Sequence, residues 1–372
     1  MFAFLALIPN LNVSLLACFF AVTISCVLLQ AIYSGFKVHS VIIIIFLVYL
    51  TSTWVIGFSN SSYGRLFNFL IFFFSFILCL EFKFSEKYIV ILSRFVLYLS
   101  VIMLATQIYI LIDNPLILYQ ANFLDESDRP QLLGNTIYVM FLCFISYILV
   151  FFCKIRKFEK ITVISLTLIY VILSGKTTSL LLFSFLLALT FIVRGGALLK
   201  IFNVLAFVVG LYFVHKFDIL PEFVSDRIVA LNDLFFKEGQ DSSNSEYLGR
   251  FDLIRLSAET FLNNIFLGVG GNYVDFKGDF TLVYNSGIGH HSEFIDFLSR
   301  FGLIGAFFLV FSILSVFGRF LLNHIDFLFF SIVVFIWFIM NNAISIEFAF
   351  LNLFTFLVIS NRTSIKGKNG VS

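Results

Sequence analysis

The sequence has little charge, almost no net charge and few cysteines, and each shortage excludes a class of protein. Only 12% of the 372 residues are charged, whereas soluble domains carry roughly 25%. The formal net charge is +2, so no bulk attraction to nucleic acid is predicted. The cysteines form no CxxC pair and lie in apolar runs, which favours buried packing over a zinc site or a disulfide framework: Cys18, Cys26, Cys79, Cys143 and Cys153.

The chain is instead rich in hydrophobic sequence, which makes up 60% of its residues. Runs of about 20 apolar residues recur along the whole length and predict an all-α polytopic membrane protein with about 11–12 transmembrane helices. Helices are the expected spanning element because an open sheet would leave backbone groups unpaired in lipid. The first apolar run has no positively charged start and no small-residue cleavage site, so we expect a retained helix.

Short polar segments between the apolar runs define the positions of the expected spans. They lie near 13–33, 40–58, 66–82, 88–112, 133–153, 161–175, 178–193, 201–217, 301–318, 325–345 and 346–360. Residues 1–8 are apolar but too short to span a bilayer. They could lengthen the first helix, lie at the interface or help to form a twelfth span.

Lysines and arginines are concentrated in alternate polar segments, and by the positive-inside rule these segments face the cytoplasm. The strongest group is Lys154, Arg156, Lys157 and Lys160, and the basic C-terminal tail agrees with it. We therefore expect an N-terminal bundle of about eight helices, a large outer loop with the candidate site, the C-terminal helices and a cytoplasmic tail, at 1–215, 216–300, 301–360 and 361–372.

Several basic residues are predicted on the outer side, against the same rule: Arg65, Arg129, Lys176, Arg250, Arg255 and Arg300. Arginine presents a planar fork of donors that matches phosphate oxygens, and lysine a mobile point charge. A cluster at the outer mouth of the bundle would suit a diphosphate head group whose lipid tail stays in the bilayer. Each side chain could equally reach the interface or pair with a loop acid, and both interpretations stay open.

Two glycine-containing motifs in the outer segments have simple alternatives. Residues 174–178 (SGKTT) resemble the end of a phosphate-binding P-loop, but Tyr170 occupies the place of the earlier glycine and no strand precedes it, which excludes nucleotide binding. A helix is expected from Tyr247 to Phe261, lying across the top of the bundle. The glycine-rich run at 268–271 could form a backbone nest for an anion, although a plain turn after this helix is favoured.

Titratable residues gather just before the expected span at 301–318. If a helix begins after His290 and His291, three charged residues share one of its faces: Glu293, Asp296 and Arg300. Asp296 and Arg300 are spaced to pair. One histidine could act as a general base, since imidazole titrates near neutral pH. The alternative is a polar helix cap with a surface salt bridge. No metal is expected, because two adjacent histidines do not easily bind one ion.

Four elements of the sequence occur in a recognisable order. They are Arg129 to Asn135 (RPQLLGN), Ser174 to Thr178, Gly249-Arg250 through Asn264 to Gly270, and His291-Ser292 followed by Gly302 to Gly305. Together, over about residues 125–320, they resemble the O-antigen polymerase and ligase superfamily of bacterial inner-membrane enzymes. Lys176 and Ile265 stand where that superfamily often has arginine and proline.

The resemblance implies an enzyme that transfers a glycan from undecaprenyl diphosphate at the periplasmic face of the inner membrane, with a cytoplasmic C-terminus. It implies that Arg129, Lys176, Arg250 and Arg255, together with Arg300, bind the diphosphate and stabilise the leaving group. His291 would be the general base, with Glu293, Asp296 or His290 as supporting groups. A single displacement implies inversion, with no cofactor and no metal. The partners implied are lipid-linked oligosaccharide donor and acceptor, membrane lipid and a chain-length regulator protein.

Three functions remain open at this level. A polymerase, favoured here, would use a second lipid-linked repeat unit as acceptor, whereas a ligase would use lipid A-core. The ligase histidine motif matches only in part, because Ala306-Phe307 lacks the threonine that often follows it. A transporter or flippase for a lipid-linked anion would use the same basic mouth without chemistry. Transporters often show internal repeats, and none is evident in this sequence.

Overall fold

The computed structural model describes most of the predicted spans and part of the predicted outer loop. The described residues are 35–55, 63–81, 85–114, 117–120, 133–194, 250–271, 292–341 and 344–369, with residues 25, 29 and 288. Within these ranges the regular structure is helical and there is no strand, which confirms the all-α class. The predicted spans at 13–33, except for residues 25 and 29, and at 201–217 lie outside the described residues, as do Arg129, His290 and His291.

Every predicted span within the described residues has its helix. These helices are α3 (Val38–Val55), α4 (Tyr63–Glu81), α5 (Glu86–Asp113), α7 (Thr136–Phe151), α8 (Lys157–Leu173), α9 (Thr177–Arg194), α14 (Glu293–Asn323), α15 (Ile325–Met340) and α16 (Ile346–Asn369). The helix expected from Tyr247 to Phe261 is α12 (Arg250–Asn263), and a short α6 (Ile117–Gln120) was not predicted. Residues 293–300, assigned from the sequence to the outer loop, are the first turns of α14.

Two of the described helices, α5 and α14, are long and apolar enough to cross a membrane, and several shorter apolar helices pack with them. Length and composition alone are modest support, since the core helix of a soluble protein can pass the same criterion. The helices are consistent with the integral membrane protein predicted from the sequence. The number of spans and the large outer loop stay predictions.

Phenylalanine packing forms the centre of the bundle. Phe46 of α3 lies edge-on to Phe73 of α4, with ring centroids 4.9 Å apart, and stacks on Phe308 of α14 at 4.8 Å. Phe297 of α14 stacks on Phe73 at 6.1 Å. Because lipid tails are as apolar as these side chains, close packing holds membrane helices together better than the hydrophobic effect does. Each aromatic pair contributes about 0.5–1.5 kcal/mol beyond its buried area.

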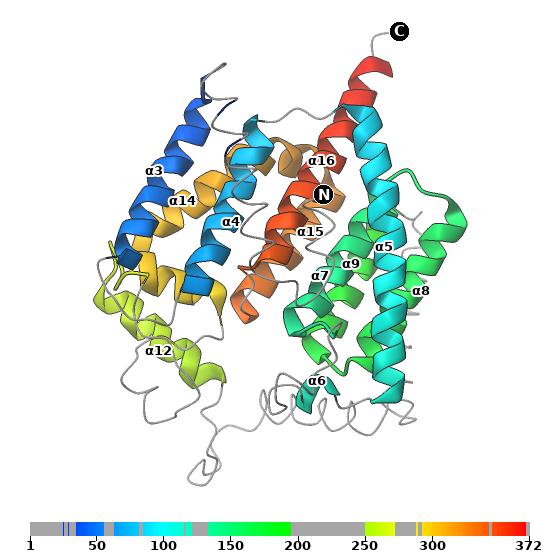
Figure 1. Ribbon diagram of the computed structural model, residues 1–372, viewed down its shortest axis with the longest axis horizontal. Coiled ribbons are helices and arrows are strands. Elements are labelled where there is room, and N and C mark those ends of the chain that lie inside the picture. Colours follow the sequence, from blue (N-terminus) through cyan, green and yellow to red (C-terminus); the bar gives the residue numbers. More distant parts are fainter. Residues whose placement is uncertain are drawn as a thin grey trace.

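Hydroxyl groups link α7, α8 and α9. The Tyr147 and Thr190 hydroxyls lie 2.6 Å apart and join α7 to α9, and Thr167 donates to Ser146 at 2.8 Å to join α8 to α7. Helix α16 packs on both α4 and α7. It therefore connects the helices that pack through phenylalanines, α3, α4 and α14, with the helices linked by hydroxyl groups, α7, α8 and α9. Figure 1 shows α12 lying across one end of the bundle, while the C-terminus lies at the opposite end.

Candidate functional site

The candidate site is built where α12 meets a break in α14. Gly302 has φ 60° and ψ −158° in the middle of α14, so the helical hydrogen-bond ladder is interrupted there. A broken helix leaves backbone donors and acceptors that need other partners. The segment that follows α12 provides them through Val269 N to Ser299 O (2.9 Å), Gly270 N to Arg300 O (2.8 Å), Leu303 N to Ile265 O (2.8 Å) and Ile304 N to Phe266 O (3.3 Å).

Glycine is required at both sides of this contact. A Cβ atom on Gly268 would lie 2.3 Å from the backbone carbonyl of Arg300, and one on Gly302 would lie 2.3 Å from the carbonyl oxygen of Phe266. Both glycines also have positive φ angles, of 66° and 60°, which other residues rarely adopt. The Gly268-x-Gly270 and Gly302-x-x-Gly305 elements therefore meet in space, although more than thirty residues separate them in the sequence.

The same contacts favour a turn over an anion nest at 268–271. The backbone amides of Val269 and Gly270 already donate to α14. The amide of Gly271 donates to Thr53 Oγ1 of α3 at 3.4 Å, and its carbonyl oxygen accepts from Arg300. The turn thus ties α3, α12 and α14 together, and these three amides point to protein acceptors.

Three charged side chains are buried on the first turns of α14. The exposed fractions are 3% for Glu293, 1% for Asp296 and 0% for Arg300. This burial excludes the surface salt bridge considered from the sequence and supports one shared inward face. The pairing of Asp296 with Arg300 stays a prediction. Ionisable groups are expensive in such surroundings, and when they occur they are candidates for a substrate path or a catalytic site.

Each buried charge is connected to a different neighbouring segment. Asp296 Oδ1 accepts from the hydroxyl of Ser257 on α12 at 2.6 Å. Glu293 Oε2 accepts from the backbone amide of Ile344, between α15 and α16, at 3.2 Å. Arg300 Nη1 donates to the carbonyl oxygen of Gly271 at 2.9 Å. The charged face of α14 therefore lies at the junction of α12, the glycine turn and the α15–α16 connection.

Serine side chains complete the junction, and sequence reasoning missed two of them, Ser257 and Ser299. Ser292 caps α14 by accepting from the amide of Ile295 at 3.3 Å. The hydroxyl of Ser299 donates to the carbonyl oxygen of Ser257 and so binds α12 a second time. Helical spacing could have found Ser257, because it follows Ile254 by three residues and precedes Phe261 by four, and these two apolar residues mark one face of the expected helix.

The predicted basic cluster is only partly brought together. Arg255 lies on α12, but its side chain is 77% exposed and pairs with Glu259 at 2.8 Å, whereas Ser257, two residues on, is buried. Residues two apart on a helix point to nearly opposite faces. Arg250 begins α12, and its side chain lies outside the described part of the chain.

Lys176 lies in the turn between α8 and α9, where Gly175 has a φ angle of 61°. Its backbone amide is 3.4 Å from Ser174 Oγ. The turn belongs to the end of the bundle that carries α12, because the start of α8 lies near the end of α16 at the opposite side. Lys176 and the charged face of α14 therefore share an end of the bundle, and the role of Lys176 in the site stays a prediction.

Gly134 and Asn135 lie at the start of α7. Asn135 Oδ1 accepts from the backbone amide of Tyr138 at 2.9 Å and caps the helix. The amide of Gly134 donates to the buried side chain of Gln107 on α5 at 3.0 Å. This element therefore fixes the start of α7 against α5, next to residues 121–132, which lie outside the described residues.

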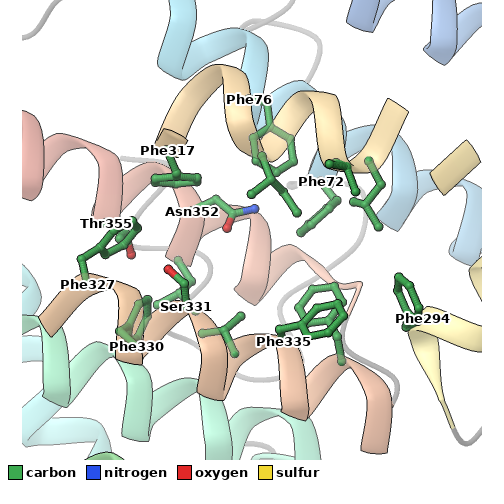
Figure 2. A pocket seen from close by; sticks show the side chains of 16 residues that line it. Phe72, Phe76, Phe294, Phe317, Phe327, Phe330, Ser331, Phe335, Asn352 and Thr355 are labelled. Atoms are coloured by element: carbon green, nitrogen blue, oxygen red, sulfur yellow. The ribbon is translucent and has the colours of Figure 1, made fainter. Parts of the chain in front are cut away.

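An apolar cavity of about 180 Å³ extends to the first turn of α14, where Phe294 lines it. It lies between α4, α14, α15 and α16, and Figure 2 shows the phenylalanine rings that surround it. Phe294, next to Glu293, lines one part, and Phe317 and Phe327 line another. The polar residues in its wall are Ser331, Asn352 and Thr355. The cavity thus reaches the first turn of α14 through Phe294, whereas Glu293, Asp296 and Arg300 do not line it.

Comparison with known proteins gives a family match for the central part of the chain. A search of curated proteins gave no match. Residues 162–310 match the family model described as O-antigen ligase. The matched stretch extends from α8 to beyond the break in α14, so it includes Lys176, α12, the glycine turn and the buried charges of α14. Residues 162–310 are therefore similar to the O-antigen ligase family, and the resemblance noted in the sequence is confirmed.

Proposed function

We propose that this protein polymerises oligosaccharide repeat units at the periplasmic face of the bacterial inner membrane. It would transfer a growing glycan from undecaprenyl diphosphate to a second, lipid-linked repeat unit. The family match supports transfer of a lipid-linked glycan. A ligase that delivers the glycan to lipid A-core is the second candidate, favoured by the description of the matching family itself.

One observation carries the proposal: the first turn of α14 contributes both to the buried charged face and to the lining of an apolar cavity. Glu293 and Phe294 are adjacent residues, and the first is part of the charged face while the second lines the cavity. A lipid-linked sugar has a charged diphosphate next to a long apolar tail, so its site needs both kinds of surface in contact. Confinement of the tail would hold the reacting carbon in place and lower the entropic cost of reaction.

The proposed reaction is a single displacement. His291 takes the proton from a hydroxyl group of the acceptor sugar, and the hydroxyl oxygen forms a bond to the anomeric carbon of the donor. The bond from that carbon to the diphosphate oxygen breaks, and undecaprenyl diphosphate leaves with the electron pair. Attack opposite the leaving group inverts the anomeric centre. Diphosphate is a good leaving group, so the transfer needs no strong general acid.

The proposed binding groups for the diphosphate are Arg129, Lys176, Arg250, Arg255 and Arg300. Positive groups stabilise the charge that develops on the leaving diphosphate. Arg255 would exchange its contact with Glu259 for the substrate, at little cost because both side chains are exposed. Ser292 caps α14, so His291 immediately precedes the charged face. Glu293 or Asp296 would orient the histidine or bind sugar hydroxyls.

The function is tested by supplying purified protein with undecaprenyl-diphosphate-linked repeat units in the absence of any energy source. A polymerase makes longer lipid-linked chains from these units alone. A ligase makes no such chains and forms a product only when lipid A-core is added. Formation of no new glycosidic bond under either condition would eliminate both enzymes and leave the transporter.

Replacement of His291 by alanine should abolish transfer without preventing membrane insertion. Loss of a general base costs typically 10²–10⁴-fold in rate. The protein level in isolated membranes and the yield of lipid-linked chains are to be measured together. His39→Ala is the matched control, because it removes an exposed histidine at the start of α3, outside the proposed site. Near-normal transfer by His291→Ala would show that His291 is not the general base.

A further inference from the structure

A second cavity, of about 370 Å³, lies at the end of the bundle opposite α12. It is enclosed by the first turns of α5 and α8, the turn that follows α7 and the last part of α16. None of the residues proposed above for glycan transfer lines this cavity. It therefore belongs to a different part of the molecule from the candidate active site.

The charges around this cavity are predominantly positive. Arg94, Lys154 and Lys160 line it, and the acidic residue in the lining is Glu86. Glu159 lies 3.7 Å from Arg94 and accepts from the backbone amide of Arg156 at 2.7 Å. Lys154 is exposed, and the side chain of Arg94 keeps 41% of its surface accessible. The cationic groups can therefore meet a ligand that arrives from solvent or from the membrane surface.

The remaining wall of the cavity is mainly apolar, with Ser93 and Asn361 as its uncharged polar residues. Ile89 of α5, Phe152 after α7 and Val358 of α16 line it, and each is less than 10% exposed. An inorganic anion would gain nothing from such a wall, because its contacts are polar. An amphiphile would use both parts, with a phosphate at the cationic rim and an acyl chain along the apolar wall.

The position of the cavity also matches a lipid headgroup. Helices α5 and α8 begin there, and α5 is one of the described helices long enough to span a bilayer. Lys154 and Lys160 belong to the basic group that predicts a cytoplasmic face. Basic pockets between membrane helices on that face bind the head groups of anionic lipids.

We propose that this cavity binds the phosphate of an anionic phospholipid, with Arg94, Lys154 and Lys160 around the headgroup and an acyl chain against Phe152 and Val358. The proposal does not rest on glycan transfer, because it concerns the opposite end of the bundle. Arginine supplies a planar fork to the phosphate and the lysines supply mobile charges. The lipid would join α5, α7, α8 and α16 at this end.

The test uses the full-length protein in a zwitterionic detergent, titrated with phosphatidylglycerol and followed by lipid-bound masses and by the unfolding temperature. The double variant Lys154→Gln, Lys160→Gln should bind this lipid on the order of thirtyfold more weakly, since each basic group near anionic lipid contributes about 1 kcal/mol. The double variant Lys87→Gln, Arg319→Gln is the matched control, because both residues are exposed and outside the cavity.

Two further measurements use the wild-type protein alone. Phosphatidylglycerol should bind more weakly as salt rises from about 0.1 M to 1 M, because the Debye length shortens from about 10 Å to 3 Å. Phosphatidylcholine and inorganic phosphate should raise the unfolding temperature less than phosphatidylglycerol does. The proposal is overturned if either of them matches phosphatidylglycerol, if salt has no effect, or if the two double variants bind this lipid equally.

Discussion

Replacing Gly302 with alanine is expected to destabilise the protein strongly and to stop glycan transfer. A side chain here meets two obstacles: the backbone has φ 60° and ψ −158°, and the new Cβ would lie 2.3 Å from the carbonyl oxygen of Phe266. The first costs about 1–3 kcal/mol and the second, as overpacking, a further 1–3 kcal/mol or so. The loss of stability should therefore be on the order of 2–6 kcal/mol.

Gly318→Ala is the matched control on the same helix. A Cβ on Gly318 would meet its nearest neighbour, Leu314, at 3.9 Å, which is ordinary contact. Alanine favours helix over glycine by roughly 0.5–1 kcal/mol, so this variant should be as stable as the parent or slightly more stable. The unfolding temperatures of both variants are to be compared in detergent. Equal temperatures would show that the break at Gly302 does not need glycine.

The glycines of the family motifs have a structural role, whereas the chemistry is proposed for other residues. Gly268 and Gly302 let two backbone segments approach and complete each other's hydrogen bonds, and Gly270 between them has a positive φ angle of 92°. They also place the charged face of α14 beneath α12. Substitution of these glycines should therefore lower stability and activity together, whereas substitution of His291 should lower activity alone. This contrast distinguishes a residue that supports the site from one that acts in it.

The helices were predictable because each apolar run needs only its own residues to form one. The predicted spans at 88–112 and 325–345 differ from α5 and α15 by a few residues at their ends. The helix at 250–263 was found from its apolar spacing in the same way. A local period of this kind is visible in a single sequence.

The break in α14 was not predictable in the same way. The sequence shows no interruption of the apolar spacing at Gly302. The break there depends on hydrogen bonds from Leu303 and Ile304 to the carbonyl oxygens of Ile265 and Phe266, which are distant in the chain. Burial of Arg300 likewise depends on contact with Gly271, which is distant in the chain. Spacing indicated that Glu293, Asp296 and Arg300 share a face, but it carried no information on what covers that face.

Arg300→Met should destabilise the protein by about 3–5 kcal/mol, the usual effect of removing one partner from a buried group of charges. Arg300 is fully buried, and its Nη1 atom donates to Gly271 at 2.9 Å. Methionine leaves that carbonyl oxygen without this donor. It also removes the positive charge from a helical face that carries Glu293 and Asp296, both buried and within about 11 Å along the helix axis.

Arg319→Met is the control, since Arg319 is exposed on the same helix and surface substitutions usually change stability by no more than about 0.5 kcal/mol. Arg300→Lys separates the two roles of this residue, because lysine keeps the charge and loses the planar fork. A stable Arg300→Lys variant with a raised KM for the lipid-linked donor would support contact with the diphosphate. If Arg300→Met unfolds at the same temperature as Arg319→Met, the buried charge does not hold the α12–α14 junction together, and the structural role assigned to Arg300 is wrong.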